Sequence, residues 1–175
     1  MNVSKLVIIV FALVLVLGGC KKNNQFTISG KITHAGGKTL YLEELLVSTT
    51  RLQDSVKINN NGEFKFKSES SIPTYYLLKF TEDKMITLLI DSLENVTVEA
   101  DYANFSREYN VEGSPGSILV KQLNDKLNDT REKLDSLRSL ENMYRGNPDY
   151  EKLKKEWDNE YNKIIQDQVD YSTNF

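Results

Sequence analysis

The chain has 175 residues, and its charged residues, 27% of the total, give a net charge of only −3. That length suits one domain of ordinary size plus a short leader, and the mixed, slightly acidic charge argues against nucleic acid as a partner. The sequence contains a single cysteine, Cys20. One cysteine cannot form an intramolecular disulfide, and it provides no Cys-x-x-Cys pair for thiol–disulfide exchange.

The first 19 residues predict a lipoprotein signal peptide. A short positive start precedes the apolar run 6–17, which is too short to cross a bilayer because a spanning helix takes about 20 apolar residues. Leu17, Gly18, Gly19 and Cys20 then resemble the bacterial lipobox, in which the signal is cut before a lipid-modified cysteine. The prediction is therefore lipidation at Cys20, with Leu17, Gly18 and Gly19 recognised for cleavage. The alternative is a cysteine in the protein core or a disulfide partner, and the chain has no second cysteine for the latter.

The predicted lipid modification also predicts where the protein is located in the cell. Two or more acyl chains hold a protein stably on a membrane, whereas one does so only marginally. Residues 20–25 would form a lipidated polar tether, and no acidic run follows Cys20. This favours a protein of the cell envelope, lipid-anchored in the outer membrane and facing the periplasm. The membrane is then a partner, and no cofactor is expected.

The segment 26–113 alternates apolar and polar residues, which is typical of strands with one buried face. Turn-forming residues interrupt the alternation, and Asn61-Gly62 is the clearest hairpin signal because both residues tolerate the positive φ of a type I′ turn. Consecutive hairpins favour antiparallel pairing. We therefore expect an antiparallel β-sandwich of about eight strands, at 26–34, 38–47, 51–58, 63–69, 74–81, 85–91, 95–102 and 107–112.

The segment 114–175 changes to a helical period. Ser114 and Pro115 predict a helix N-cap followed by proline at the first helical position. The segment 145–149 breaks the helical pattern, with Gly146 as the expected C-cap. The prediction is an antiparallel helical hairpin after the sandwich, and hence an α+β fold. The two apolar stripes are Leu119, Leu123, Leu127, Thr130, Leu134, Leu137, Leu140 and Tyr144, then Tyr150, Leu153, Trp157, Tyr161, Ile164, Ile165 and Val169.

The predicted helices are longer than the predicted strands. A helix of about 27 residues is about 40 Å long at 1.5 Å per residue, whereas a typical strand spans only about 17–20 Å. The hairpin should therefore extend beyond the sandwich. Its apolar stripes then need the other helix, another chain or a further domain to cover them.

Five segments resemble a known family when taken in order: FTISGKITHAGGKTLYLEEL, DSVKINNNGEFKFK, YYLLKF, MITLLIDSLENVTVEADY and VEGSPGS. Over about residues 26–116 the chain is similar to an N-terminal β-rich domain of unknown function in bacterial lipoproteins. In that family a helical region and a thioredoxin-like domain follow, as in thiol-disulfide interchange proteins. The resemblance implies a thioredoxin-like partner, in cis or in trans. Because this chain lacks the Cys-x-x-Cys pair, no catalytic residue carries over.

Few residues suggest chemistry of their own. His34, the only histidine, is expected on the surface, without the second histidine or cysteine that a zinc site would need. Glu43 and Glu44 are adjacent in a predicted strand, so their side chains should point to opposite faces and be solvated. Trp157 is expected to pack within the hairpin. We predict no catalytic residue and no metal site.

A group of acidic residues lies near predicted strand ends, but its spacing is not that of a calcium loop, in which several oxygens converge. These residues are Asp91, Glu94, Glu99 and Asp101. The glycine-bearing segments HAGGK and GSPGS match neither a phosphate loop nor a dinucleotide fingerprint, and we interpret both as turns.

The leading hypothesis is a non-catalytic accessory domain of periplasmic thiol-disulfide oxidoreductases, held on a lipid anchor. One alternative is a glycan- or peptide-binding lipoprotein, in which Tyr75, Tyr102 and Tyr109 stack on a ligand, although tyrosine is also an ordinary strand former. Another is that the chain is the N-terminal part of a thioredoxin-like oxidoreductase.

Overall fold

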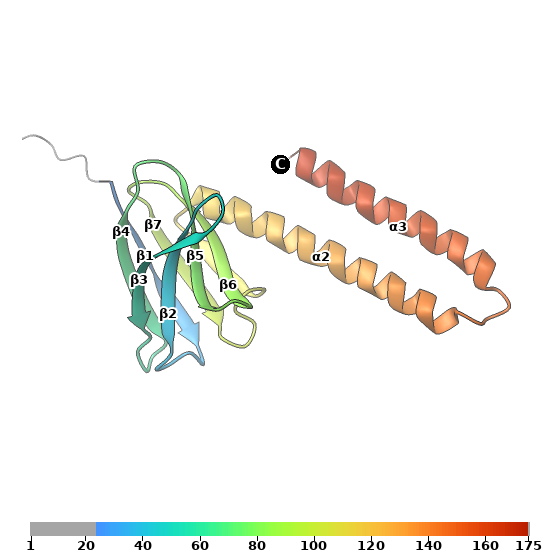
Figure 1. The fold of residues 1–175 in the computed structure, drawn as a ribbon, viewed down its shortest axis with the longest axis horizontal. Coiled ribbons are helices and arrows are strands. Elements are labelled where there is room, and N and C mark those ends of the chain that lie inside the picture. The colour runs from blue at the N-terminus through green and yellow to red at the C-terminus, as the bar shows by residue number, and fades with distance from the viewer. Residues whose placement is uncertain (1–23, 175) are drawn as a thin grey trace, which may run out of the picture.

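The computed structural model of the protein describes residues 24–174. Figure 1 shows a β-sandwich with a long helical hairpin extending from one side. The strands are β1 (Gln25–Thr33), β2 (Thr39–Leu45), β3 (Thr50–Lys57), β4 (Glu63–Glu69), β5 (Thr74–Thr81), β6 (Lys84–Ile90), β7 (Asn95–Asp101) and β8 (Tyr109–Glu112). The helices are α2 (Pro115–Tyr144) and α3 (Tyr150–Thr173). The predicted α+β class, the strands and the hairpin are confirmed.

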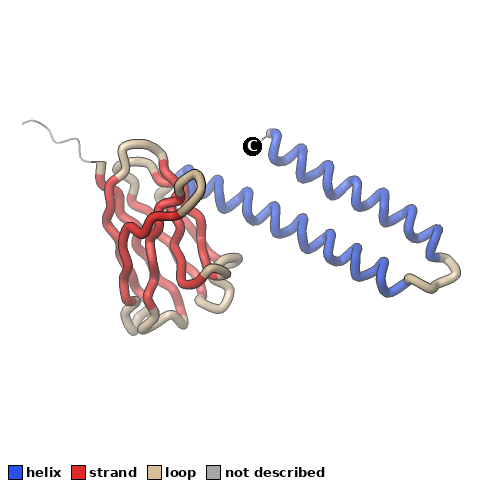
Figure 2. The backbone as a smooth tube through the Cα atoms, in the orientation of Figure 1, coloured by secondary structure: helices blue, strands red, loops and turns tan. Residues whose placement is uncertain are grey.

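The strands form two four-stranded sheets, in the orders β4-β1-β7-β8 and β3-β2-β5-β6. Figure 2 shows the strands gathered in one body with both helices outside it. The alternating apolar residues of both sheets point inward and form a single core, as expected when two sheets pack face to face. Its most deeply buried members include Phe26, Ile28, Ile32, Leu40, Leu42, Phe66, Tyr76, Leu78, Ile86 and Leu88.

One strand pair is parallel. β1 pairs with β7 in parallel, and Thr33 lies opposite Asp101 in their register. The hairpin pattern in the sequence predicted antiparallel pairing, which holds for β2–β3, β5–β6 and β7–β8. It does not extend to β1 and β7 because these strands are distant in the sequence, and the chain visits the other sheet twice between them.

The Asn61-Gly62 turn differs from its prediction. β3 and β4 belong to different sheets, so the turn joins two layers and is not a β-hairpin. Gly62 has a positive φ of 84°, but Asn61 is not among the described residues that do. Instead, the Asn59 side-chain oxygen accepts hydrogen bonds of 2.9 Å from the backbone N–H groups of Asn61 and Glu63. An Asx-type turn therefore replaces the type I′ turn.

The N-cap prediction at Ser114 is confirmed, and the same residue joins the helix to the sandwich. The Ser114 Oγ accepts a hydrogen bond from the Ser117 backbone N–H at 3.2 Å. The hydroxyl groups of Ser114 and Ser117 both donate to the carbonyl oxygen of Leu89 in β6, at 2.9 and 3.0 Å. Because β6 is an edge strand, these contacts satisfy an edge carbonyl that would otherwise be open to another strand.

Glycine at position 116 permits this close approach. A Cβ atom on Gly116 would lie 2.9 Å from the Leu89 carbonyl oxygen and 3.0 Å from the Leu89 Cγ atom. The segment GSPGS is therefore the junction of sheet and helix, which agrees with its interpretation as a turn. It fixes the point at which the hairpin leaves the sandwich.

The two helices run antiparallel (Figure 1). α2 ends with Arg145 as its C-cap, and Gly146 does not adopt a positive φ, so the predicted glycine cap is wrong. The turn closes instead through backbone hydrogen bonds from Gly146 and Asn147 to the carbonyl oxygen of Tyr144. Trp157 packs against the rings of Tyr144 and Tyr150 beside this turn, as predicted for a hairpin residue. Within residues 24–174, no helix has the length and apolar character needed to cross a membrane.

Candidate functional site

The predicted lipidation site lies outside the described residues. It comprises Leu17, Gly18, Gly19 and Cys20. The described chain begins four positions later at Asn24, which is held at one end of the sandwich. Its side-chain amide donates to the Ser71 hydroxyl at 3.0 Å, and its carbonyl oxygen accepts from the Ser70 N–H at 3.0 Å. Any tether from residue 20 therefore meets the domain at this end.

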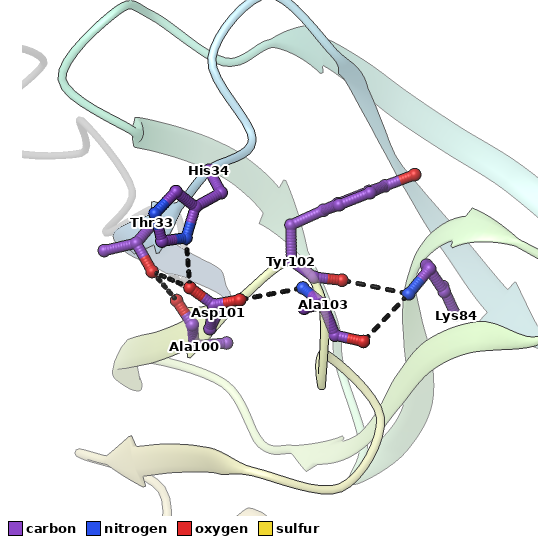
Figure 3. Close-up of polar contacts among 7 residues, drawn as sticks. All are labelled: Thr33, His34, Lys84, Ala100, Asp101, Tyr102 and Ala103. Carbon is purple, nitrogen blue, oxygen red and sulfur yellow. Dashed lines mark hydrogen bonds and ion pairs between the residues drawn. The ribbon is translucent and has the colours of Figure 1, made fainter.

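The opposite end carries a cluster of polar contacts around Asp101, drawn in Figure 3. The parallel register of β1 and β7 brings Thr33 and His34 to this carboxylate. The Thr33 hydroxyl and the His34 Nδ1 atom each lie 2.5 Å from Asp101 Oδ2, and the Ala103 N–H donates to Asp101 Oδ1 at 2.8 Å. These bonds, that from Thr33 foremost, lower the pKa of Asp101 to about 2.

This cluster links the end of β1 to the end of β7 through the Asp101 carboxylate. A carboxylate that orients an exposed histidine is one part of a general-base arrangement. However, the Thr33 hydroxyl donates to the same oxygen of Asp101 and not to the imidazole of His34, so it is not placed as a nucleophile. In residues 24–174, no three His, Cys, Asp or Glu side chains come together as metal ligands. His34 is on the surface, as predicted.

The sequence alone did not predict the contact between His34 and Asp101. The two residues are 67 positions apart, and only the register of two non-consecutive strands makes them neighbours. The positive φ of His34, 59°, has no signature in the sequence. A turn glycine is the ordinary signal for such a conformation, and here the glycines come after the histidine.

Two of the three tyrosines proposed for ligand stacking already make contacts within the protein that leave little of their rings free. The ring of Tyr102 has the Lys38 and Lys84 amines at 4.3 and 4.8 Å from its centroid. Tyr109 is buried, and that burial raises the pKa of its hydroxyl. Only Tyr75 is well exposed. The glycan- or peptide-binding alternative therefore loses most of the surface on which it was based.

The carboxylates of Glu43 and Glu44 have separate partners, as adjacent strand residues should. Glu43 lies 3.5 Å from the Lys79 amine, whereas Glu44 accepts hydrogen bonds of 2.6 Å from both Arg51 and Gln53. Their side chains are only 15% and 17% exposed, so the prediction of solvated charges is wrong. Cross-strand partners on β3 and β5 cover both.

The acidic residues near β7 do not converge. Asp91 and Glu94 lie in the turn before the strand, and Asp101 lies at its far end. Glu94 accepts a hydrogen bond from the Asp91 N–H at 3.1 Å, and Asp91 accepts one from the Ser92 N–H at 2.7 Å. These two carboxylates satisfy backbone donors of the turn, while Glu99 is exposed along β7.

The helical hairpin leaves much of its apolar surface uncovered. Beyond the first turn of α2, its only buried residues are Thr130 and Ile164, which both belong to the predicted stripes. The Thr130 hydroxyl donates to the Gln168 side-chain oxygen at 2.7 Å and so links the two helices. The large apolar residues that remain exposed on the hairpin are Ile118, Leu119, Leu127, Leu140, Met143, Tyr144, Tyr161 and Val169.

A groove of about 400 Å³ lies between the helices. Leu137, Leu140 and Ile164 form its apolar lining, and Asp129, Glu132, Lys133, Ser136 and Glu160 form its polar lining. A long helix in water gains most of its stability by packing an apolar face. A pair of helices with one narrow seam provides little such packing, so this surface is suited to a further partner.

These features define a class: a two-sheet sandwich that carries a helical hairpin at one edge. The chain matches the model of one family, a domain of unknown function (DUF4369), over residues 26–127. The match covers more than half of the 175 residues, and the chain belongs to this family. Apart from Gln25, the match includes all eight strands of the sandwich and the start of α2, and thus the contact between Ser114 and Leu89. No curated protein sequence matches the chain.

The family match confirms the resemblance to a β-rich domain of unknown function. It does not extend to a thioredoxin-like domain. The association with such a domain remains a prediction.

Proposed function

We propose that this chain is a lipid-anchored, non-catalytic accessory module of the cell envelope. In this proposal the sandwich is the scaffold, and the helical hairpin is the docking element for a thioredoxin-like domain, in cis or in trans. One observation carries the proposal: the hairpin is fixed to the sandwich at its base, yet among its described residues Ile164 is the only fully buried large apolar one and eight others remain exposed.

The attachment of α2 to the sandwich favours a hairpin that holds its exposed surface in a fixed position, not one that moves as a flexible tail. The hydroxyl groups of Ser114 and Ser117 both bond to Leu89, and the chain between them is already the first turn of α2. A helix held at its base in this way loses little further freedom when a partner binds, and preorganisation of that kind improves affinity. Exposed apolar residues on such an element are typical of a protein–protein interaction site.

A non-catalytic role for this chain also agrees with the arrangement of its polar side chains. The most developed polar cluster, around Asp101, has no nucleophile placed against His34. The one cysteine of the sequence is the predicted lipid attachment site, and a thioether has no thiolate with which to exchange disulfides. The thioredoxin-like identity of the partner rests on the family resemblance, and redox chemistry would belong to that partner.

Site-specific photo-crosslinking tests the docking role. A photoreactive residue replaces Leu127 or Tyr161, both exposed on the hairpin, in the full chain expressed in a bacterial envelope. We expect crosslinks to a protein that contains a Cys-x-x-Cys pair. The matched control is Lys65, exposed on β4. Equal crosslinking at position 65, or crosslinks only to a second copy of this chain, would contradict the proposal.

Intact-mass analysis tests the anchor. The expected product begins at residue 20 and carries the mass of a diacylglyceryl group, with or without an acylated amine. Cys20→Ser should leave the signal uncleaved and the lipid absent. An unmodified residue 20 in the mature wild-type protein would refute the anchor.

A further inference from the structure

We propose that the end of the sandwich from which the tether leaves is a membrane-contacting surface. Leu46, Val47, Ile72 and Leu93 form this surface, which we call the apolar tip. The inference rests on the lipid anchor of the proposed function and adds the orientation of the domain on the bilayer. In this orientation the turns of the apolar tip touch the lipid headgroup region, and the Asp101 cluster faces away.

Strand register places the three turns of the apolar tip at one end. Glu44 pairs with Tyr76, so the β2–β3 turn lies beside the β4–β5 connection. Thr74 pairs with Ile90, which places the β6–β7 turn at the same end. The N-terminus is there too, because the Leu93 N–H donates to the Gln25 carbonyl oxygen at 3.1 Å. Figure 1 shows the beginning of β1 at this end of the sandwich.

The four side chains of the apolar tip are exposed to solvent. The exposed fractions are 39% for Leu46, 107% for Val47, 67% for Ile72 and 62% for Leu93. Single exposed apolar residues are normal on a protein surface. Here, however, they occupy all three strand-to-strand turns at one end of the sandwich.

The opposite end is different. Its connections are 34–38, 58–62, 82–83 and 102–108, and within them no described large apolar residue is exposed. The apolar residues that these connections do contain, such as Ile58 and Phe105, are buried in the core. The two ends of one sandwich thus differ in polarity, and the apolar end is the one that bears the tether.

The backbone of Leu93 adopts an unfavourable conformation in the β6–β7 turn at this end. Its φ is 68°, in the left-handed region, which is unfavourable for a residue with a Cβ atom and where glycine or asparagine is the usual choice. A leucine in that conformation with an exposed side chain stabilises neither the turn nor the core. Contact between the side chain and lipid would give it an apolar environment.

The tether is short enough to bring the apolar tip to the bilayer. Asn24 follows Cys20 by four positions, and a fully extended chain of that length spans at most about 14 Å. A short tether gives a high effective concentration of the attached surface. The bilayer is therefore the surface that this end meets first and most often.

The charges near the apolar tip are compatible with the headgroup region. The carboxylates of Asp91 and Glu94 accept hydrogen bonds from the backbone of their own turn, and Arg51 is paired with Glu44. Lys21 and Lys22 follow the lipid attachment site in the sequence, and lysines next to an anchor are attracted to anionic lipids.

A depth measurement on the lipidated full-length protein tests the inference. Val47→Cys and Asn60→Cys each provide one free thiol, because lipidation consumes Cys20. Each variant is labelled with an environment-sensitive fluorophore and inserted into vesicles of phosphatidylethanolamine and phosphatidylglycerol, with and without acyl-chain-brominated lipids. We expect a blue shift and quenching at position 47. Asn60 is exposed at the opposite end, and position 60 should show neither change.

A second pair of measurements checks that the contact is apolar. In the Val47→Cys background, Ile72→Glu should reduce the quenching at position 47, while circular dichroism reports an unchanged fold. Lipid on residue 20 without quenching at position 47, or equal quenching at positions 47 and 60, would overturn the orientation and leave the anchor intact. A mature chain without lipid by mass would overturn the anchor, and the orientation with it.

Discussion

The hydroxyl group of Ser114 donates a hydrogen bond of 2.9 Å to the carbonyl oxygen of Leu89, 25 residues earlier in the chain. The same oxygen atom of Ser114 accepts from the Ser117 N–H and so caps α2. One buried side chain therefore starts the helix, covers part of the edge of β6 and fixes the place where the hairpin leaves the sandwich. The docking role proposed for the hairpin depends on this contact.

Ser114→Ala should destabilise the domain and loosen the base of α2. The change removes an N-cap and one of two donors to Leu89, with an expected loss of about 1–2 kcal/mol in the free energy of unfolding. Urea unfolding measures the loss, and hydrogen exchange of the first turn of α2 locates it. Ser139→Ala is the control, because its exposed hydroxyl bonds only to Asp135 within the same helix. Equal losses for the two variants would show that Ser114 has no special role.

Gly113→Ala should destabilise the fold far more than Gly37→Ala. Both glycines have a φ of 79°, so both variants incur the cost of about 1–2 kcal/mol for a left-handed alanine. At position 113 the new Cβ atom would also lie 2.0 Å from the Asn95 carbonyl oxygen, whereas nothing lies within 4 Å of it at position 37. The difference between the two melting temperatures isolates the steric contribution. Similar melting temperatures would contradict the close packing of β8 against β7 that this geometry describes.

The sequence predicted the elements of this fold better than their arrangement. Alternation marks strands because one face of each is buried, and Ser114 before Pro115 marks a helix start because both signals are local. The parallel pairing of β1 with β7 depends on interactions between residues distant in the sequence, and so does the contact between His34 and Asp101. The Asn61-Gly62 prediction was wrong for the same reason: the local turn signal carries no information about which sheet the next strand joins.

The functional surfaces were also only partly predictable. The hairpin stripes were visible as periodic apolar residues, but which of them a second helix would cover was not. The apolar tip has no periodic signature, because its residues lie in three separate turns: Leu46 and Val47 in the first, Ile72 in the second and Leu93 in the third. The signal in the sequence is the presence of large apolar residues in turns, since turns normally contain polar residues and glycine. That signal becomes meaningful only after strand register places the three turns together.

Thr33→Val should raise the pKa of Asp101 from about 2 toward the ordinary 3.8, because it removes the strongest hydrogen bond to the carboxylate. A pKa that is lower in the folded state stabilises the protein above the unfolded-state pKa, and this stability is lost as the pH falls through the folded-state pKa. The wild type should therefore lose this contribution between about pH 4 and about pH 2, and the variant should retain less of it near neutral pH. NMR titration of the Asp101 carboxyl carbon measures the shift directly. Thr97→Val, an exposed substitution in β7, should leave that titration unchanged.

The bond between Thr130 and Gln168 should contribute to the pairing of the two helices. Thr130→Val removes the donor and is expected to cost about 1 kcal/mol of unfolding free energy. The double variant Thr130→Val/Gln168→Leu should recover most of that loss, because replacing both partners by apolar groups of similar shape can be nearly neutral. A double-mutant cycle with urea unfolding gives the coupling energy, with a sign that shows whether the bond stabilises the hairpin. A coupling energy near zero would mean that other contacts hold the helices together, such as the packing around Ile164 and the ring contact between Trp157 and Tyr144. In that case the stability of the hairpin would depend even more on a partner. Partner binding, reported by crosslinking at Leu127, should then increase the protection of α3 from hydrogen exchange.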